Sequence, residues 1–561
     1  MNLVLDRLEA MLPAQSAPEP GSSVAEPTVL RGWLDGLKLA ERHFALMRLR
    51  NALHEFNTLL MAPRQRLAML EMFELAAAAL IDDVKNEVRE FFPMSSQRVD
   101  EILLADEIER ELGLGYIGVV CGLAERSGTV SFLRRGCVTK ALVRASACQK
   151  GRLWLACRRL AAPAAGVWQG LHDLFGFAVG CGCADRESTL VQGGARTSTR
   201  SIYTQALLLA FAKPNQFTQA RNRQLHTSLP VLASWCEMRR GHTLNGAIAV
   251  CTTSDQSPPA MPAEGWMDAG ADWSLDTRAL FAQLDTLVAG SHGQGEVVVH
   301  ALYGAGVATL AVDLVEALRR VWSGHTERES ARSADQAWFE TEVGLSRVHS
   351  HLTGCQDMES TSPLAGETSL PVASWALRMP DHAEPKHACA QVIDSSRHGY
   401  RLRWKPGEDA RARVGELIAL APVTRGERQW RYGALRWLRT QGDAAVEAVV
   451  ELLPSPIPVA VYALDANGVS LAPVRGILVG ASSEGRQANG RSILVPRPFA
   501  RDAVGVEVVR IDESDAGTMP RSVRVAQFIA QDAGLYQKII LSSDAIERIV
   551  GGGSDESDAR I

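Results

Sequence analysis

The stretch that most constrains the fold is a pair of apolar runs joined by a short polar turn, residues 392–404. The first run ends at Asp394, and hydroxyl and basic residues lead from there to Gly399. Apolar and basic residues then alternate over residues 400–404. Because a period of two is that of a half-buried strand, the pattern predicts strand, tight turn and strand. Gly399 is a residue that can take a positive φ in the turn.

Further short strand-like runs follow this hairpin, separated by turn residues such as Pro406 and Gly407. Several short strands at close spacing, with turn residues between them, are typical of a small antiparallel barrel. The further runs are residues 414–420, 430–438 and 446–453.

The polar turn itself has a defined chemistry. It carries a carboxylate, hydroxyl groups and backbone N–H groups, and arginines lie just beyond it. Such a turn can hold an anionic, planar ligand through donors for phosphate, an acceptor for a base edge and guanidinium planes for stacking. The alternative interpretation is an ordinary Asx-type hairpin turn.

The stretch 385–455 resembles a PilZ domain. Asp394, Ser396 and Gly399 stand where that family has its (Asp/Asn)-x-Ser-x-x-Gly motif. Residues 430–438 are similar to the hydrophobic strand that precedes the last barrel strand in the family. The resemblance implies an antiparallel barrel that binds cyclic di-GMP.

The resemblance also implies roles for individual side chains. Asp394 and Ser396 would bond the polar edge of the ligand, and Gly399 would permit the turn. Arg397 and Arg401 are further candidates for contacts to phosphate. We expect no catalytic residue, no metal site and no cofactor, so cyclic di-GMP is the one small molecule anticipated.

PilZ domains also carry an Arg-x-x-x-Arg pair whose guanidiniums hold the phosphates and guanines of the ligand. No such pair stands directly before Asp394, and the nearest is Arg328 with Arg332, more than sixty residues earlier. The resemblance therefore implies ligand binding by these two arginines if a segment is inserted in the domain. The Ser-, Thr- and Gly-rich run 354–370 fits an insertion near residues 344–385. Alternatively, the two arginines belong to a solvated helix end of mixed charge.

Length and charge bound the class of protein. The 561 residues argue for several domains, because single cores stop growing well below this size. The formal net charge of −5 argues against bulk nucleic-acid binding. The first residues lack a basic and apolar signal segment, and no run approaches about twenty apolar residues. We expect a soluble, cytoplasmic bacterial protein with no nucleic-acid partner and no membrane insertion.

Most of the N-terminal half has apolar residues at helical spacing, as in Leu46, Leu49, Leu53 and Phe56. No fixed repeat period accompanies the pattern. Irregular helical scaffolds usually make protein contacts, so an unidentified protein partner is expected here. The helical segments expected are residues 46–60, 67–84, 96–112, 142–160, 168–177, 202–212 and 229–237.

A Gly-x-Gly sequence in the middle of the chain is compatible with a dinucleotide-binding unit or with a simple turn. Residues 297–302 predict a strand, Gly304 and Gly306 follow, and a helical pattern then runs to Arg320. Strand, Gly-x-Gly and helix open a dinucleotide-binding unit, but Thr309 replaces the third glycine of that fingerprint. The favoured interpretation is a tight strand-to-helix turn without nucleotide.

The ten cysteines are scattered, which favours reduced thiols over a disulfide framework. Cys181 and Cys183 are the closest pair, with His172 nearby in sequence. Since no second pair completes four ligands, buried thiols are expected rather than a metal site. His349 and His351 lie on different faces of a short predicted helix and are interpreted as surface or half-buried residues.

Beyond Pro454, short β-like runs between Gly and Asn turns predict a second small β domain. The fold class expected is α+β multidomain: a mostly α-helical N-terminal half, a PilZ-like antiparallel β-barrel and a second small β domain at the C-terminus. The expected parts are a flexible leader (1–30), a helical scaffold (31–240), a mixed α/β segment (241–325), a PilZ-like barrel (326–455), the second β domain (456–545) and a disordered tail (546–561).

The leading functional hypothesis is a cyclic di-GMP receptor or adaptor whose helical half contacts a protein partner. The alternative is an interaction scaffold with a degenerate PilZ-like domain that binds no nucleotide. An enzyme is not expected, because the chain has no Gly-x-Ser-x-Gly elbow, no P-loop and no His-Glu-x-x-His motif.

Overall fold

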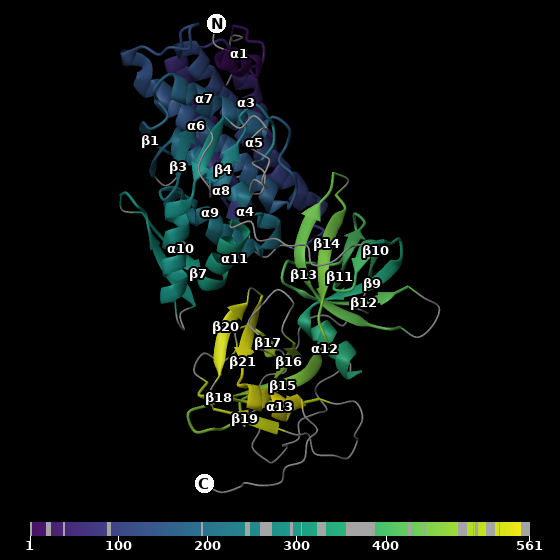
Figure 1. The fold of residues 1–561 in the computed structure, drawn as a ribbon. Helices are drawn as coiled ribbons and strands as arrows, with labels where there is room; N and C mark the ends of the chain where they lie inside the picture. Colours follow the sequence, from purple (N-terminus) through teal and green to yellow (C-terminus); the bar gives the residue numbers. More distant parts are fainter. Residues whose placement is uncertain are drawn as a thin grey trace. The chain divides into compact units, whose positions relative to one another are not determined.

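The structure of the chain, a computed structural model, divides into two compact units. Figure 1 shows its ribbon, coloured along the sequence from purple at the N-terminus to yellow at the C-terminus. The first unit holds residues 1–90 and 94–327, and the second holds residues 91–93 and 328–561. The structure describes residues 3–550 except 18–23, 38–39, 87–90, 192–193, 242–246, 258–271, 292–294, 305, 323–332, 355–386, 424–427, 443, 481–490, 498, 500–502, 512–521, 527 and 534.

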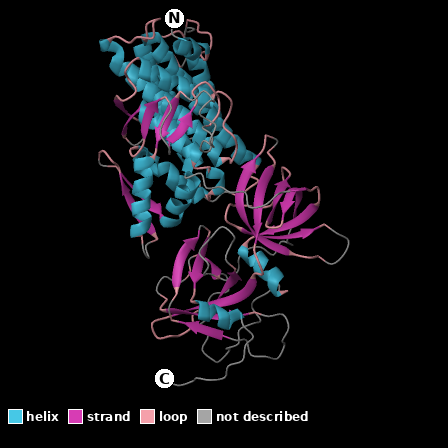
Figure 2. Ribbon diagram, in the orientation of Figure 1, coloured by secondary structure: helices cyan, strands magenta, loops and turns pink. Residues whose placement is uncertain are grey.

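The first unit is mostly helical, as the apolar spacing predicts, and Figure 2 shows its helices in cyan. Its helices are α1 (Leu3–Ala10), α2 (Pro27–Leu37), α3 (Arg42–Asn57), α4 (Pro63–Asn86), α5 (Ser96–Leu123), α6 (Phe132–Arg158), α7 (Val167–Gly180), α8 (Thr199–Phe211), α9 (Gln219–Ala233), α10 (Arg278–Gly290) and α11 (Val312–Trp322), with a 3-10 turn at Pro214–Gln216. Helix α5 begins at Ser96 because the Ser95 hydroxyl accepts a hydrogen bond from the Arg98 N–H at 3.3 Å.

Two details differ from the sequence predictions. Residues 3–10 of the expected flexible leader form α1, because Leu5 and Leu8 are buried and Arg7 forms an ion pair with Asp173 at 2.5 Å. The helix expected over residues 229–237 is α9, which begins earlier, at Gln219, and ends at Ala233, and Glu237 begins strand β3 (Glu237–Arg240). The mixed segment after residue 241 shares one hydrophobic core with α6–α9, so it packs onto the helical scaffold.

Short sheets complete the first unit. They are the pair β1 (Glu187–Thr189) and β2 (Arg196–Ser198), the three strands β3 (Glu237–Arg240), β5 (Trp273–Asp276) and β4 (Ala247–Val250) in that spatial order, and the pair β6 (Glu296–His300) and β7 (Val307–Ala311). The Gly304-to-Gly306 stretch joins β6 to the antiparallel β7, with His300 opposite Val307. The expected strand-to-helix turn is therefore a hairpin, and an antiparallel pair does not form a dinucleotide-binding unit.

The second unit contains a closed antiparallel barrel. Its strands are β8 (Ser333–Ala334), β9 (Trp338–Val343), β10 (Ala388–Ser396), β11 (Gly399–Trp404), β12 (Leu417–Pro422), β13 (Arg431–Thr440) and β14 (Val446–Leu452). Among the described residues the spatial order is β11-β14-β13-β12-β9-β10-β8, and pairing of β10 with β11 closes the ring. The barrel of the predicted fold class is confirmed.

The predicted hairpin is present with the predicted faces. Tyr400, Leu402 and Trp404 are buried inside the barrel, whereas Arg401 and Arg403 are partly exposed. The Trp404 indole N–H donates to the Thr341 hydroxyl at 3.0 Å, so even the polar atom of this large ring is satisfied.

The barrel is completed by strands from both sides of residues 355–386. Helix α12 (Leu345–Thr353) follows β9, and β10 begins after His387. His351 and His387 both contact the buried carboxylate of Glu342, at 3.1 and 2.7 Å. The two flanks of this chain segment therefore meet at one side chain of β9.

A second β domain also lies in this unit. Its strands are β15 (Ile457–Leu464), β16 (Val474–Val479), β17 (Ser492–Pro496), β18 (Gly505–Arg510), β19 (Ser522–Val525), β20 (Ile529–Ala533) and β21 (Tyr536–Ile540). Helix α13 (Ser543–Val550), which the sequence pattern did not indicate, buries Ile546 and Ile549 and extends into the expected tail. One hydrophobic cluster combines Leu345 and Val348 of α12 with barrel and β16 residues, so barrel and second β domain share a core.

Helix α12 carries His349, which is 1% exposed and lies with its Nε2 3.4 Å from the Val459 carbonyl oxygen of β15. Burial, together with the charge of Arg475, lowers the pKa of His349 to about 4. A neutral buried imidazole contributes stability that is complete above the unfolded pKa of about 6.5 and is lost as the pH falls toward 4.

We therefore expect the unfolding free energy of the second unit to fall by up to about 3 kcal/mol between neutral pH and pH 4 through this residue. Urea unfolding at a series of pH values, compared between the wild type and His349→Gln, isolates the contribution. Parallel pH dependences of the two proteins would contradict it.

Candidate functional site

The Asp-x-Ser-x-x-Gly hairpin lies at the turn between β10 and β11. Ser396 pairs with Gly399, and only Arg397 and His398 lie between them. The Ser396 hydroxyl accepts from the His398 N–H at 3.3 Å and lies 3.4 Å from the Gly399 carbonyl oxygen. These bonds within the turn shape it as a hydroxyl-containing turn usually does.

Gly399 is required for a reason other than the expected one. Its φ is not positive, so the turn does not use the left-handed conformation that a glycine allows. A Cβ on Gly399 would instead overlap the carbonyl oxygen of Val450 on β14. The glycine of the motif therefore allows the close approach of β11 to β14.

The side chains of the motif gather on the outer face of four neighbouring strands, in the order β10, β11, β14 and β13. Arg401 of β11 is central. Its Nη1 lies 3.7 Å from Asp394 Oδ2, and its Nη2 donates to Glu447 Oε2 at 2.6 Å. Its guanidinium carbon lies 5.8 Å from the ring centroid of Trp437. We call Asp394, Arg401, Trp437 and Glu447 the barrel-face cluster.

Two β-bulges place residues of this cluster outside the barrel. One lies between Val392 and Asp394 on β10, and the other between Leu435 and Trp437 on β13. Leu435 and Leu438 are both fully buried, so the residues between them turn outward together. A bulge re-aims side chains in this way and is frequent beside functional sites.

Burial differs within the barrel-face cluster. The side chain of Arg401 is 33% exposed and that of Asp394 19%, whereas that of Glu447 is only 7% exposed. The buried Glu447 carboxylate thus fixes the position of the Arg401 guanidinium. Arg401 and Asp394 are the charged groups of the cluster that are more accessible to solvent. A guanidinium fixed by a carboxylate and backed by an indole is a preorganised stacking surface.

Arg328 and Arg332 lie outside the described residues. Strand β8 nevertheless begins at Ser333, the residue after Arg332 in sequence. Ser333 pairs with Ser395, and Ala334 pairs with Asp394. The chain that directly follows the Arg-x-x-x-Arg sequence is therefore hydrogen-bonded to the strand that carries Asp394.

The remaining candidate, Arg397, is in the turn and donates through Nε to His398 Nε2 at 3.0 Å. Sequence reasoning missed Trp437 and Glu447, although both stand in strands that it predicted. One sequence signal could have indicated Trp437. Two residues, one polar and one aromatic, stand between Leu435 and Leu438, and they interrupt the alternation of buried and exposed positions in the strand.

Other candidate centres do not gather ligands. Within the described parts of the chain, no group of three or more His, Cys, Asp or Glu residues could hold a metal ion. Cys183 is buried, and hydrogen bonding from Cys181, with help from Arg135 and Arg186, lowers its pKa to about 6.

No helix built from described residues is long and apolar enough to cross a membrane.

Comparison with known proteins gives two matches. A family model described as the N-terminal domain of the cyclic-di-GMP receptor FimW matches residues 28–241. A second, described as the middle PilZ domain of the cyclic-di-GMP receptor FimW, matches residues 377–457, which include β10 to β14. No curated protein and no solved structure matches the chain.

Proposed function

Because the chain belongs to the family of FimW cyclic-di-GMP receptors, we propose that it binds cyclic di-GMP on the barrel-face cluster, Asp394, Arg401, Trp437 and Glu447. The observation that carries the proposal is the position of Arg401. Its guanidinium lies between an indole and two carboxylates, next to the Asp-x-Ser-x-x-Gly turn. The family consists of receptors, which makes the chain a binding protein.

Each member of the cluster has a proposed role. Arg401 stacks on a guanine base through the face of its guanidinium that Trp437 does not cover. Asp394 accepts N–H groups from the edge of the base, because an ionised carboxylate is an acceptor only. Glu447 positions Arg401 and does not touch the ligand, since its side chain is buried.

Phosphate contacts are assigned to Arg328 and Arg332, with Arg397 and the Ser396 hydroxyl as further donors. The β8–β10 pairing supports this assignment, because Ser333, which directly follows Arg332 in sequence, pairs with Ser395 of the strand that leads into the turn. Bidentate bonds from guanidinium to phosphate are among the strongest hydrogen bonds in proteins.

The output of binding is assigned to a protein partner of the helical unit. The first family model matches most of that unit and describes a separate N-terminal domain of the receptor. In this proposal the PilZ domain detects the ligand and the helical unit contacts the partner.

A scaffold that binds no nucleotide is the second candidate, and one observation favours it. Arg401 forms an ion pair with Asp394 and a hydrogen bond to Glu447, so its charge is already compensated without ligand, although its Nε has no hydrogen-bond partner among the described residues. Ligand binding by Asp394 must then replace the 3.7 Å contact with Arg401.

Calorimetric titration of the full chain with cyclic di-GMP separates the two candidates. The receptor proposal expects saturable heat at a 1:1 or 2:1 ratio of ligand to protein, together with none for GMP under the same conditions. Absence of heat with cyclic di-GMP would refute the receptor proposal and leave the scaffold.

A further inference from the structure

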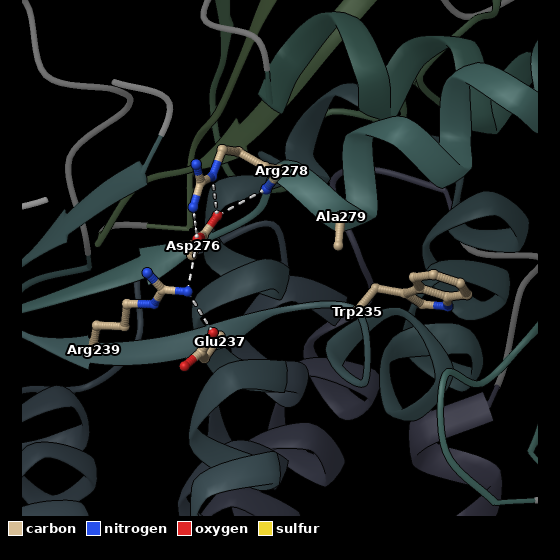
Figure 3. Close-up of a pocket in the computed structure, with 6 residues that line it drawn as sticks. All are labelled: Trp235, Glu237, Arg239, Asp276, Arg278 and Ala279. Atoms are coloured by element: carbon tan, nitrogen blue, oxygen red, sulfur yellow. Dashed lines mark hydrogen bonds and ion pairs between the residues drawn. The ribbon is translucent and has the colours of Figure 1, made fainter. Parts of the chain in front are cut away.

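The helical unit contains an open cavity of about 350 Å³ that the proposed function does not use. It lies where α9 leads into β3 and where β5 leads into α10. Figure 3 shows the six residues that line it: Trp235, Glu237, Arg239, Asp276, Arg278 and Ala279. We call this the β3 cavity.

Two guanidiniums in the β3 cavity share one carboxylate. Arg278 donates to Asp276 through Nε at 3.0 Å and Nη2 at 2.6 Å, and its backbone N–H donates at 3.1 Å. Arg239 Nη2 lies 3.5 Å from the same carboxylate and 2.7 Å from Glu237. The bonds from Arg278 lower the pKa of Asp276 and keep it ionised. Asp276 thus lies between the two guanidiniums and holds both of them, as Figure 3 shows.

These ion pairs do not use all the donors. They occupy Nη2 of Arg239, and Nε and Nη2 of Arg278. In the parts of the chain that the structure describes, Arg239 Nε has no hydrogen-bond partner but is buried, so an incoming carboxylate must bind the terminal nitrogens of this side chain, which is 41% exposed. Glu237, at 65% exposure, is the less firmly held of the two carboxylates. An incoming carboxylate can therefore take the place of Glu237 on Arg239 without disturbing Asp276.

The opposite wall of the β3 cavity is apolar. It is formed by Trp235 and Ala279. The Trp235 indole N–H donates to the His300 carbonyl oxygen at 2.9 Å, which fixes the ring in place. A fixed aromatic wall beside paired arginines is the composition of protein-recognition sites, where Trp and Arg dominate the binding energy.

We infer that the β3 cavity binds an acidic segment of a partner protein, with a carboxylate on Arg239 and Arg278 and an apolar side chain two residues away in the same segment on Trp235. A peptide is favoured over a free small molecule because strand β3 is an edge of its sheet among the described strands, so an extended peptide can lie along it.

The inference names a chemistry for the protein partner in the proposed function, but it does not depend on nucleotide binding. Its test therefore uses the full chain without cyclic di-GMP. The probes are fluorescein-labelled hexapeptides in which a valine and an aspartate or glutamate stand two residues apart with serine between them, and matched hexapeptides with asparagine or glutamine in place of the acid. Binding is read as fluorescence anisotropy.

We expect the acidic peptides to bind and the amide peptides to bind at least tenfold more weakly. Arg239→Gln or Arg278→Gln should each weaken acidic-peptide binding by about 10- to 100-fold, because each removes a charge-assisted bond. Glu237→Gln should leave binding equal or about threefold tighter, since it removes a competing surface carboxylate. Ala279→Glu keeps all four charged side chains and should abolish binding by placing a carboxylate in the cavity.

Equal binding of acidic and amide peptides would overturn the inference, as would equal acidic-peptide binding by the wild type and both arginine variants. A separate binding experiment uses inorganic phosphate in place of the peptides. Phosphate binding that requires Arg278, with no binding of acidic peptides, would assign the β3 cavity to a small anion and also overturn it. Circular dichroism of each variant controls for folding.

Discussion

Replacing Arg332 or Asp394 with alanine is expected to weaken cyclic di-GMP binding about 100-fold in calorimetric titration. In the proposed site Arg332 makes charge-assisted bonds to phosphate and Asp394 accepts from a base edge. Each such bond contributes about 1.5–3 kcal/mol, and 1.4 kcal/mol is a factor of ten in affinity. Arg328→Ala should have an effect of similar size.

The matched control is Arg524→Ala, which removes an exposed arginine from β19 of the second β domain, where its Nε lies 3.4 Å from Glu507 Oε2. This variant should bind cyclic di-GMP like the wild type. Binding lost in Asp394→Ala but kept in Arg328→Ala and Arg332→Ala would retain the receptor and require a different source of phosphate contacts. Binding unchanged in all three would place the ligand elsewhere.

The second large effect is on the fold. Gly399→Ala is expected to destabilise the second unit by about 3 kcal/mol, because its Cβ would overlap the backbone carbonyl of Val450. The neighbouring atom is backbone in the β11–β14 ladder, so the strands must separate to make room. Urea unfolding monitored by near-ultraviolet circular dichroism measures the loss.

Gly442→Ala is the matched control in the same barrel. Gly442 has no positive φ, and an added Cβ would meet no atom within 4 Å. Its effect should stay within about 0.5 kcal/mol, as for other surface substitutions. Equal stability of Gly399→Ala and the wild type would show that β11 can move away from β14 without cost, and would remove the structural reason for this glycine.

The hairpin of β10 and β11 could be predicted from the sequence because its information is local. The alternation over residues 400–404 shows which side chains of the strand face the core, and the single polar turn shows where the chain reverses direction. The role of Gly399 could not be predicted, because it depends on Val450, which is distant in sequence. A glycine near a turn indicates equally a positive φ or a close approach.

Trp437 and Glu447 were missed for a related reason. Their contacts with Arg401 depend on the register of β11, β13 and β14, which pairs residues far apart in the chain. The bulge beside Trp437 also shifts the faces by one residue, so simple alternation fails. Predicted strands therefore did not suffice to predict the barrel-face cluster.

In the helical unit, the helices could be predicted from the sequence but a short hairpin could not. Helical spacing predicted the positions of most helices, since an amphipathic face is a local property. The hairpin at Gly304 was not recognised, because β7 has only five residues and is followed at once by α11. Short strands next to helices carry too little periodicity to separate the two.

The meeting of His351 and His387 at Glu342 has a consequence for how such domains are detected. His351 and His387, the described histidines on either side of residues 355–386, meet at one side chain, and doubling the length of a loop between two such fixed positions costs only about 0.6 kcal/mol of closure free energy. Evolution can therefore vary the number of residues between β9 and β10 at little cost in stability. A sequence search that demands a fixed spacing across this connection will overlook barrels in which the same two strands still pair.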